Sequence, residues 1–256
     1  MTDAAELAHL TVQSGIATIT LDSPTNHNAL SAQLRAELLD ALEHSAHDKS
    51  TRVVVLDHTG PTFCAGMDLR EPRTDGNQGI GEFRQILERI WTHPKPVVAK
   101  LAGPARAGGI GLVAAADVAV AARDATFAFT EVRIGLVPAM ITVTVLPRLL
   151  PRAAHELFLT GETFDAARAV AVGLLNSAVP ADQLAAEVTR YTGMLRAGAP
   201  EALMLTKQLL HRSHSAMAED FVAMAELSAQ RFASAEAREG IRAFTEKRSP
   251  SWITTR

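Results

Sequence analysis

The sequence predicts an α/β fold, in which buried strands alternate with helices along the chain. Two apolar runs carry this prediction, VVVLDH at 53–58 and VVAKL at 97–101. Short continuous runs rich in valine are typical of strands that a parallel sheet buries on both faces. Helical segments flank both runs, and this order of elements is typical of α/β proteins. The 256 residues, of which 47% are hydrophobic, suffice for a sizeable core.

The first elements are a hairpin and a helix. Residues 8–12 and 16–21 alternate apolar and polar or carry β-branched side chains on either side of a Ser-Gly pair, which predicts a β-hairpin. A turn cluster, SPTNHNALS, follows. It ends at Ser31, a plausible N-cap for a helix from Ala32 to about His47.

The middle of the chain continues the alternation. Residues 70–82 are charged and contain glycine, and we expect them to be mobile. A helix from about Gly81 to Thr92 follows, and the sequence HPKP ends it. After the second buried strand comes a glycine-rich turn, then a short apolar helix and another strand.

From Pro147 the composition changes to alanine, leucine and charged residues. Strand character is confined to about Ala178–Val179. We assign residues 1–195 to a core and residues 196–256 to a C-terminal helical region. Such an Ala-rich extension needs an apolar partner, which favours a homo-oligomer. The segments predicted to be mostly helical are 152–160, 164–173, 181–197, 200–211 and 216–247.

Composition excludes several classes of function. A formal charge of −3 gives no electrostatic basis for binding nucleic acid or an acidic membrane. The single cysteine, Cys64, excludes an internal disulfide. We find no signal-peptide pattern and no apolar run of about 18 residues, so we expect a soluble, cytoplasmic protein. Neither metal-ligand spacing nor a nucleotide-binding glycine motif occurs, so no metal or redox cofactor is expected.

The stretch from Leu101 to Pro138 carries the candidate chemistry. Gly108 and Gly109 stand at the start of a helix, where backbone N–H groups can point at a ligand oxygen. Glu131 lies among apolar residues, and its desolvation would raise the pKa and suit the carboxyl to proton transfer. Together they indicate chemistry through an enolate. A glycine turn used only for packing and a solvated or ion-paired glutamate are the alternatives.

Two glycine-containing turns each follow a buried strand, FCAGMD at 63–68 and GPARAGGIG at 103–111. If the strands lie side by side, both turns emerge at the same edge of the sheet. Two backbone N–H groups could then bind one carbonyl oxygen. Such an oxyanion hole contributes roughly 3–4 kcal/mol per donor in acyl-transfer enzymes.

Seven segments in order resemble the crotonase family, also called the enoyl-CoA hydratase/isomerase family, over essentially the whole chain. The resemblance implies a spiral of ββα units and a C-terminal helical region that packs trimers, often paired into hexamers. It also implies an acyl-CoA thioester substrate, with coenzyme A as part of the substrate and no separate cofactor. The segments are HNALS (27–31), FCAGMDL (63–69), KPVVAKLAG (95–103), AGGIGLVAAADVAVA (107–121), TEVRIGLVP (130–138), FLTGETFDAARAVAVGLLN (158–176) and AFTEKRSP (243–250).

The resemblance also implies roles for individual residues. The oxyanion donors map to the N–H groups of Met67 and Gly108, and the acid/base maps to Glu131. Gly66 and Gly109 are the other turn glycines that the chain keeps.

Further positions are implied to bind coenzyme A. The backbone around Ala65, Asp68 and Leu69 would lie against its adenine and pantetheine, and Asp68 is better explained as a residue that fixes the backbone than as a catalytic acid. Lys247 matches a basic position that meets the CoA phosphates, either within one subunit or across a subunit boundary. Phe244 would lie beside it, although a place in the core explains this aromatic equally well.

One departure from the family leaves the reaction open. The typical hydratase carries a second carboxylate twenty residues before the Glu131 position, and here that position is Gly111. One interpretation is a hydratase, because the sequence of these motifs resembles that of bacterial methylglutaconyl-CoA hydratases. The others are a Δ3,Δ2-enoyl-CoA isomerase that needs only Glu131, and a degenerate acyl-CoA binder. For Arg106, a surface ion pair is favoured over contact with an acidic acyl tail or a phosphate.

Overall fold

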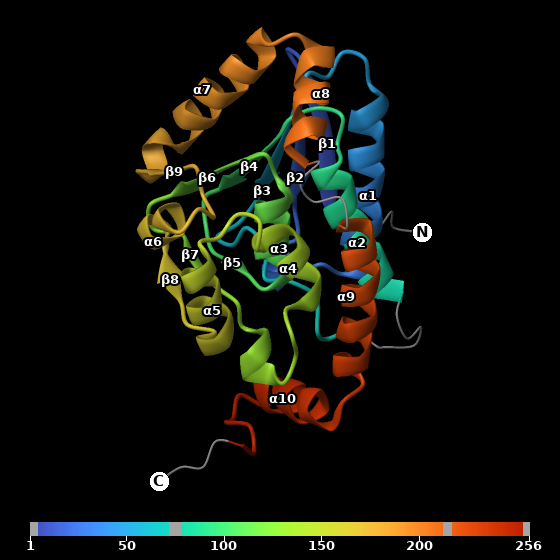
Figure 1. Cartoon of the computed structure of the whole chain (residues 1–256), viewed down its shortest axis with the longest axis vertical. Coiled ribbons are helices and arrows are strands. Elements are labelled where there is room, and N and C mark those ends of the chain that lie inside the picture. Colours follow the sequence, from blue (N-terminus) through green and yellow to red (C-terminus); the bar gives the residue numbers. More distant parts are fainter. Residues whose placement is uncertain (1–4, 72–77, 212–216, 253–256) are drawn as a thin grey trace.

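The computed structural model describes residues 5–71, 78–211 and 217–252, and it contains two sheets surrounded by helices (Figure 1). The main sheet has the strand order β1-β2-β3-β4-β6-β9, and the small sheet has the order β5-β7-β8. The strands are β1 (Ala8–Gln13), β2 (Ile16–Leu21), β3 (Val53–His58), β4 (Val97–Leu101), β5 (Ala105–Arg106), β6 (Val118–Ala122), β7 (Thr126–Ala128), β8 (Phe164–Asp165) and β9 (Ser177–Val179). The helices are α1 (Ala32–His47), α2 (Gln78–Trp91), α3 (Gly108–Ala115), α4 (Ala139–Val145), α5 (Pro151–Thr160), α6 (Ala166–Ala171), α7 (Leu184–Ala197), α8 (Pro200–His211), α9 (Met217–Phe232) and α10 (Ala235–Thr245), with 3-10 turns η1 (Pro24–Asn26), η2 (Glu131–Ile134) and η3 (Ala181–Gln183).

The main sheet confirms the predicted α/β architecture. β1 and β2 form the expected antiparallel hairpin, and every later pairing in this sheet is parallel. The predicted N-cap is also present, since the Ser31 side chain accepts a hydrogen bond from the Leu34 N–H at 3.3 Å. Hence the helix after the hairpin begins where the sequence places it.

Both faces of the main sheet are apolar and covered. Along β3, Val54 and Leu56 belong to the larger core cluster, whereas Val53 and Val55 belong to a second cluster with α7. α1 packs on β1 and β2, and α7 packs on β3, β4 and β6, so helices lie on opposite sides of the sheet (Figure 1). The continuous run of valines in β3 therefore reflects burial on both faces.

The small sheet was not predicted. Its strands have two or three residues each, too few for a period-2 pattern to appear in the sequence. β5 and β7 are parallel, with Arg106 opposite Ala128. Phe164 and Asp165, which we expected in a helix, instead pair antiparallel with β7.

The C-terminal third is mostly helical, as predicted, but the stretch 216–247 is not one helix. Within its described part, α9 ends at Phe232 and α10 begins after Ser234, whose side chain accepts a hydrogen bond from the Ala237 N–H at 3.1 Å. A serine N-cap among alanines is the sequence signal that marks this break. The division of the chain at 195/196 stays a prediction.

A buried ion pair attaches α8 to the main sheet. The Lys207 ammonium donates to Asp117 Oδ2 at 2.7 Å, and the same oxygen accepts the N–H of Val97 at the start of β4 at 2.8 Å. The Lys207 side chain is only 8% exposed.

Farther along the chain, α9 packs on α4 and α2, and α10 packs on η2. In the described parts of the chain, no helix is both long and apolar enough to cross a bilayer.

A glycine at the contact between the two turn-bearing strands gives the first test. A Cβ on Gly103 would lie 1.9 Å from the Pro61 carbonyl oxygen, so Gly103→Ala must separate two backbones. We expect the variant to lose about 3 kcal/mol of unfolding free energy, measured by urea denaturation. In the control, Gly193→Ala in α7, the new Cβ meets nothing within 4 Å, and helix propensity should add up to about 1 kcal/mol. Equal stability of the two variants would contradict the assigned packing.

Candidate functional site

The HNALS turn (27–31) is hydrogen-bonded to the first glycine turn. The Leu30 N–H donates to the Gly66 carbonyl at 2.7 Å, and the Ala65 N–H donates to the His27 carbonyl at 3.1 Å. Asn28 is fully buried, and its amide donates to the carbonyls of Thr59 and Thr62 at 3.0 and 2.7 Å. Asn28 was missed as a site-supporting residue, although a buried amide in a turn is a common backbone anchor.

The two glycine turns lie side by side, as predicted. The Phe63 N–H donates to the Pro104 carbonyl at 2.9 Å, and the Arg106 N–H donates to the Cys64 carbonyl at 3.0 Å. A Cβ on Gly66, which has φ +91°, would lie 3.1 Å from the Gly108 nitrogen. The Met67 amide is the next one along the chain, so the fold brings both predicted oxyanion donors together.

Glycine is required on the second turn as well. A Cβ on Gly109 would lie 2.4 Å from the Cys64 carbonyl oxygen and 2.9 Å from Cys64 Cβ. Cys64 is fully buried, and burial raises the pKa of its thiol to about 12. A thiol with this pKa stays protonated, so Cys64 is a packing residue and not a nucleophile.

Ala107, directly before α3, holds a strained backbone. Its φ and ψ are +45° and −120°, a region that only glycine visits readily. The Ala107 N–H donates to the Ala128 carbonyl of β7 at 3.1 Å, which helps to fix this conformation. The strain orients the peptide that carries the Gly108 N–H. No sequence signal marks it, because alanine rarely adopts such angles.

Glu131 emerges from the same end of the small sheet as the second turn. β5 and β7 are parallel, Gly108 follows β5 by two residues and Glu131 follows β7 by three. The carboxyl is buried, and its Oε2 has no hydrogen-bond partner in the described chain. Desolvation raises the pKa of Glu131 to about 7, although a bond from its own backbone N–H partly opposes the shift. A carboxyl with this pKa can both take and give a proton near neutral pH.

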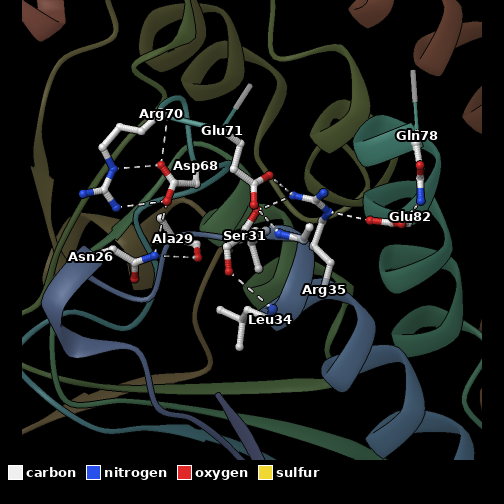
Figure 2. A network of polar contacts seen from close by, with 12 residues as sticks. Asn26, Ala29, Ser31, Leu34, Arg35, Asp68, Arg70, Glu71, Gln78 and Glu82 are labelled. Carbon is white, nitrogen blue, oxygen red and sulfur yellow. Dashed lines mark hydrogen bonds and ion pairs between the residues drawn. The ribbon is translucent and has the colours of Figure 1, made fainter. Parts of the chain in front are cut away.

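Polar contacts hold the chain just after the first turn (Figure 2). Asp68 accepts from the Arg70 backbone N–H and guanidinium at 2.9–3.0 Å and from the Asn26 amide at 3.3 Å. The Arg70 guanidinium lowers the pKa of the Asp68 carboxyl, which therefore stays ionised. These contacts agree with Asp68 as a residue that fixes the backbone. Its neighbours Ala65 and Leu69 are half-buried.

A buried arginine extends this network to two helices (Figure 2). Arg35 of α1 donates to Glu71 Oε2 at 3.0 Å, to Glu82 Oε2 of α2 at 2.8 Å and to the Leu30 carbonyl at 2.6 Å. Arg35 is 4% exposed. The first turn is thereby tied between α1 and α2.

Neighbouring side chains fill the space beside Gly111, the position where the resemblance implies that a typical hydratase carries its second carboxylate. A Cβ there would lie 2.6 Å from Ile141 Cγ2 and 3.3 Å from Leu87 Cδ2. One helical turn earlier, a Cβ on Gly108 would lie 3.1 Å from Phe83. Parts of α2 and α4 therefore lie against α3. Residues 72–77 are outside the described residues.

Comparison with known proteins agrees with this geometry. The family model described as enoyl-CoA hydratase/isomerase matches residues 11–255. The chain belongs to this family. An enoyl-CoA hydratase structure from Mycobacterium avium superposes with a TM-score of 0.88 at 41% identity, covering 98% of this chain and 100% of that one. Enoyl-CoA hydratase domain-containing protein 3 of Rattus norvegicus is 32% identical over 94% of this chain and 82% of its own length. Carnitinyl-CoA dehydratase of Proteus mirabilis is 31% identical over 95% of this chain and 97% of its own.

The resemblance predicts that the C-terminal segment reaches coenzyme A. Here Lys247 and Phe244 are exposed at the end of α10, with Phe244 64% exposed. The alternative that Phe244 is a core residue is therefore wrong for the single chain, because α10 buries Ala237, Gly240 and Ala243 instead.

Arg106 also differs from its preferred interpretation. No carboxylate pairs with it among the described residues, so the surface ion pair is wrong. Its guanidinium donates to the Thr126 carbonyl at 2.5 Å and hydroxyl at 2.8 Å and to its own neighbour, the Ala105 carbonyl, at 3.0 Å. The half-buried side chain thus ties β5 to β7.

The buried carboxyl of Glu131 should make stability depend on pH in a definite direction. Its folded pKa is raised from 4.5 to about 7, so the folded state binds the proton more tightly than the unfolded chain. Stability then falls as the pH rises between these values. Glu131→Gln removes this dependence. We expect the unfolding free energy of the variant to exceed that of the native protein by about 2 to 3 kcal/mol more at pH 8 than at pH 5, in urea titrations. Parallel pH curves would show that Glu131 is not desolvated.

Proposed function

We propose that the chain hydrates enoyl-CoA thioesters through an enolate, with Glu131 as acid and base. The observation that carries this proposal is the buried Glu131 oxygen without a partner, on the same edge of the small sheet as the Gly108 turn. The names of the relatives, two hydratase-type proteins and a dehydratase, support this class of reaction.

In the proposed reaction the thioester oxygen accepts hydrogen bonds from the Met67 and Gly108 amides. Ionised Glu131 takes a proton from water as the water oxygen attacks C3. The electron pair of the double bond moves to the thioester oxygen, where the two amides stabilise the enolate by roughly 3–4 kcal/mol per donor. Protonated Glu131, or a second water, then supplies the proton to C2. A pKa of about 7 suits Glu131 to both steps.

We also propose how coenzyme A binds. Ala65, Gly66, Asp68 and Leu69 would present backbone groups to the adenine and pantetheine, on the turn that Arg70 and Asn26 hold (Figure 2). Gly109 would keep the second turn close enough to the first. The exposed Lys247 would meet CoA phosphates with Phe244 beside it. This chemistry requires no metal or further cofactor.

A second candidate is double-bond migration, a Δ3,Δ2-enoyl-CoA isomerase activity. The observation in its favour is that Ile141 and Leu87 occupy the space where a second carboxylate would stand. Hydrocarbon at this position leaves Glu131 to carry a proton from C2 to C4 without competing water. A catalytically degenerate acyl-CoA binder is the third candidate.

Replacement of the proposed base is the direct test. Glu131→Gln keeps the size of the side chain but cannot exchange a proton, so we expect kcat to fall at least 100-fold. The dissociation constant for coenzyme A, measured by calorimetry, should change less than threefold because Glu131 lies outside the proposed CoA contacts. Full activity of this variant would move the base to another residue.

The reaction itself is distinguished by three substrates. Crotonyl-CoA and 3-methylglutaconyl-CoA report hydration through loss of conjugated-enoyl absorbance, and trans-3-hexenoyl-CoA reports isomerisation through its gain. We expect hydration of at least one of the first two. Isomerisation alone would establish the second candidate, and inactivity on all three would favour the binder.

The filled space at Gly111 can be tested by exchange. Gly111→Glu alone should cost about 1–3 kcal/mol of stability, because its side chain collides with Ile141. Adding Ile141→Ala removes the collision and places a second carboxylate in the site. We expect the double variant to hydrate crotonyl-CoA at least tenfold faster than the Ile141→Ala control. A stable double variant without this gain would show that position 111 no longer faces the reacting atoms.

We further propose a homotrimer or homohexamer. Apolar side chains that are about half exposed or more gather on the C-terminal helices and on and around α5, where another subunit would bury them. They include Leu146, Leu150, Leu159, Leu205, Leu209, Leu210 and Val222. The nearness to methylglutaconyl-CoA hydratases and the cytoplasmic location both stay predictions from the sequence.

A further inference from the structure

The turn that carries Glu131 lies directly against the backbone of α10. A Cβ on Gly240 would lie 2.2 Å from the Ile134 carbonyl oxygen, and a Cβ on Gly135 would lie 2.6 Å from the backbone carbon and oxygen of Glu236. At both glycines the backbone of η2 or its end touches the backbone of α10 directly, so a displacement of α10 moves the turn. α10 lies at one end of the molecule, beyond α9 (Figure 1).

Arg231, near the end of α9, fixes the direction of this contact. Its guanidinium donates to the Gly135 carbonyl at 3.2 Å and pairs with Glu236 of α10. Gly135 ends the η2 turn in the left-handed conformation, and its own N–H donates to the Glu131 carbonyl. Two hydrogen bonds therefore link Arg231, through Gly135, to the backbone of the proposed base.

The turn also contacts α5. The Arg133 guanidinium donates to the Thr160 carbonyl at 3.3–3.4 Å. A Cβ on Gly161 would lie 3.0 Å from the Phe129 carbonyl oxygen, and the Phe129 ring stacks on Phe158 of α5 with centroids 4.1 Å apart. The Glu131 turn thus contacts both α5 and the segment where α9 meets α10. We call this segment, residues 231–240, the α9–α10 corner.

We infer that the α9–α10 corner is a positioning element for Glu131, in which Gly240 sets the distance of the turn from α10 and Arg231 fixes its direction. This inference rests on the proposed function, because it assigns the corner to the residue proposed as acid and base. It gives the C-terminal region a part in proton transfer beyond subunit packing. A loose corner leaves substrate binding intact but places the carboxyl wrongly.

Gly240→Ala tests the inference, with Gly193→Ala as the control. Both positions are helical, but only the first new Cβ meets a backbone. We expect Gly240→Ala to lower kcat at least tenfold with KM within twofold. The pH midpoint of kcat should move below about 7, because a displaced turn admits water to the carboxyl. Gly193→Ala should keep the native kcat, KM and pH midpoint.

Arg231 provides a second test that does not depend on the fold tolerating a new Cβ. Arg231→Met removes the donor and keeps the length, whereas Arg231→Lys keeps one donor. We expect kcat to fall at least fivefold in the Met variant, with KM unchanged and with partial recovery in the Lys variant.

The outcomes separate the inference from the proposed function. If Glu131→Gln is inactive while folded Gly240→Ala and Arg231→Met keep native kcat and pH midpoint, the positioning role is wrong and the base assignment stands. If activity falls only in proportion to the folded fraction, the corner is merely structural and the inference is again wrong. If Glu131→Gln is fully active, the proposed function fails first.

Discussion

The site depends on close contact between the backbones of the two glycine turns. A Cβ on Gly103 or on Gly109 would lie 1.9 or 2.4 Å from a carbonyl oxygen of the other segment, and Gly66, with φ +91°, lies against the Gly108 amide. The pairing of residues 63–64 with 104–106 then sets where the Met67 and Gly108 amides point. Ala107 adopts an unfavourable backbone conformation as part of this arrangement. Local strain is maintained because hydrogen bonds to both neighbouring strands determine the path of the chain.

A second constraint is the unsatisfied carboxyl in an otherwise well-packed interior. Burying the Glu131 carboxyl with Oε2 unpaired among the described residues opposes folding above its pKa, and the hydrophobic core has to compensate. The same desolvation brings the pKa to a value useful for proton exchange. The same apolar environment therefore lowers the stability of the folded protein and makes the carboxyl suitable for proton exchange. Such a trade-off is common where proteins keep reactive groups.

The sequence predicted the hairpin, the buried strands, the Ser31 cap and the meeting of the two turns, because these follow from local patterns and from the geometry of parallel strands. It could not predict β5, β7 and β8, whose pairing is fixed by tertiary contacts over two or three residues. Nor did it show that Ile141 fills the space at Gly111, since 30 residues separate them in the chain. The contacts of Gly135 with Glu236 were equally invisible, because a glycine that ends a turn looks the same whether a helix packs on it or not.

The ion pair between Lys207 and Asp117 has a consequence for how such sequences diverge. The ammonium is almost wholly withdrawn from water and also donates to the Ile90 and Lys95 carbonyls. Losing either charge leaves the other in the interior at a cost of about 3–5 kcal/mol, whereas exchanging both avoids this cost and leaves only the Val97 N–H, at about 1–3 kcal/mol, without its acceptor. Natural selection therefore removes single replacements but admits the double one. Lineages that lack the lysine should lack the aspartate too, and the two positions should change together even though 90 residues lie between them.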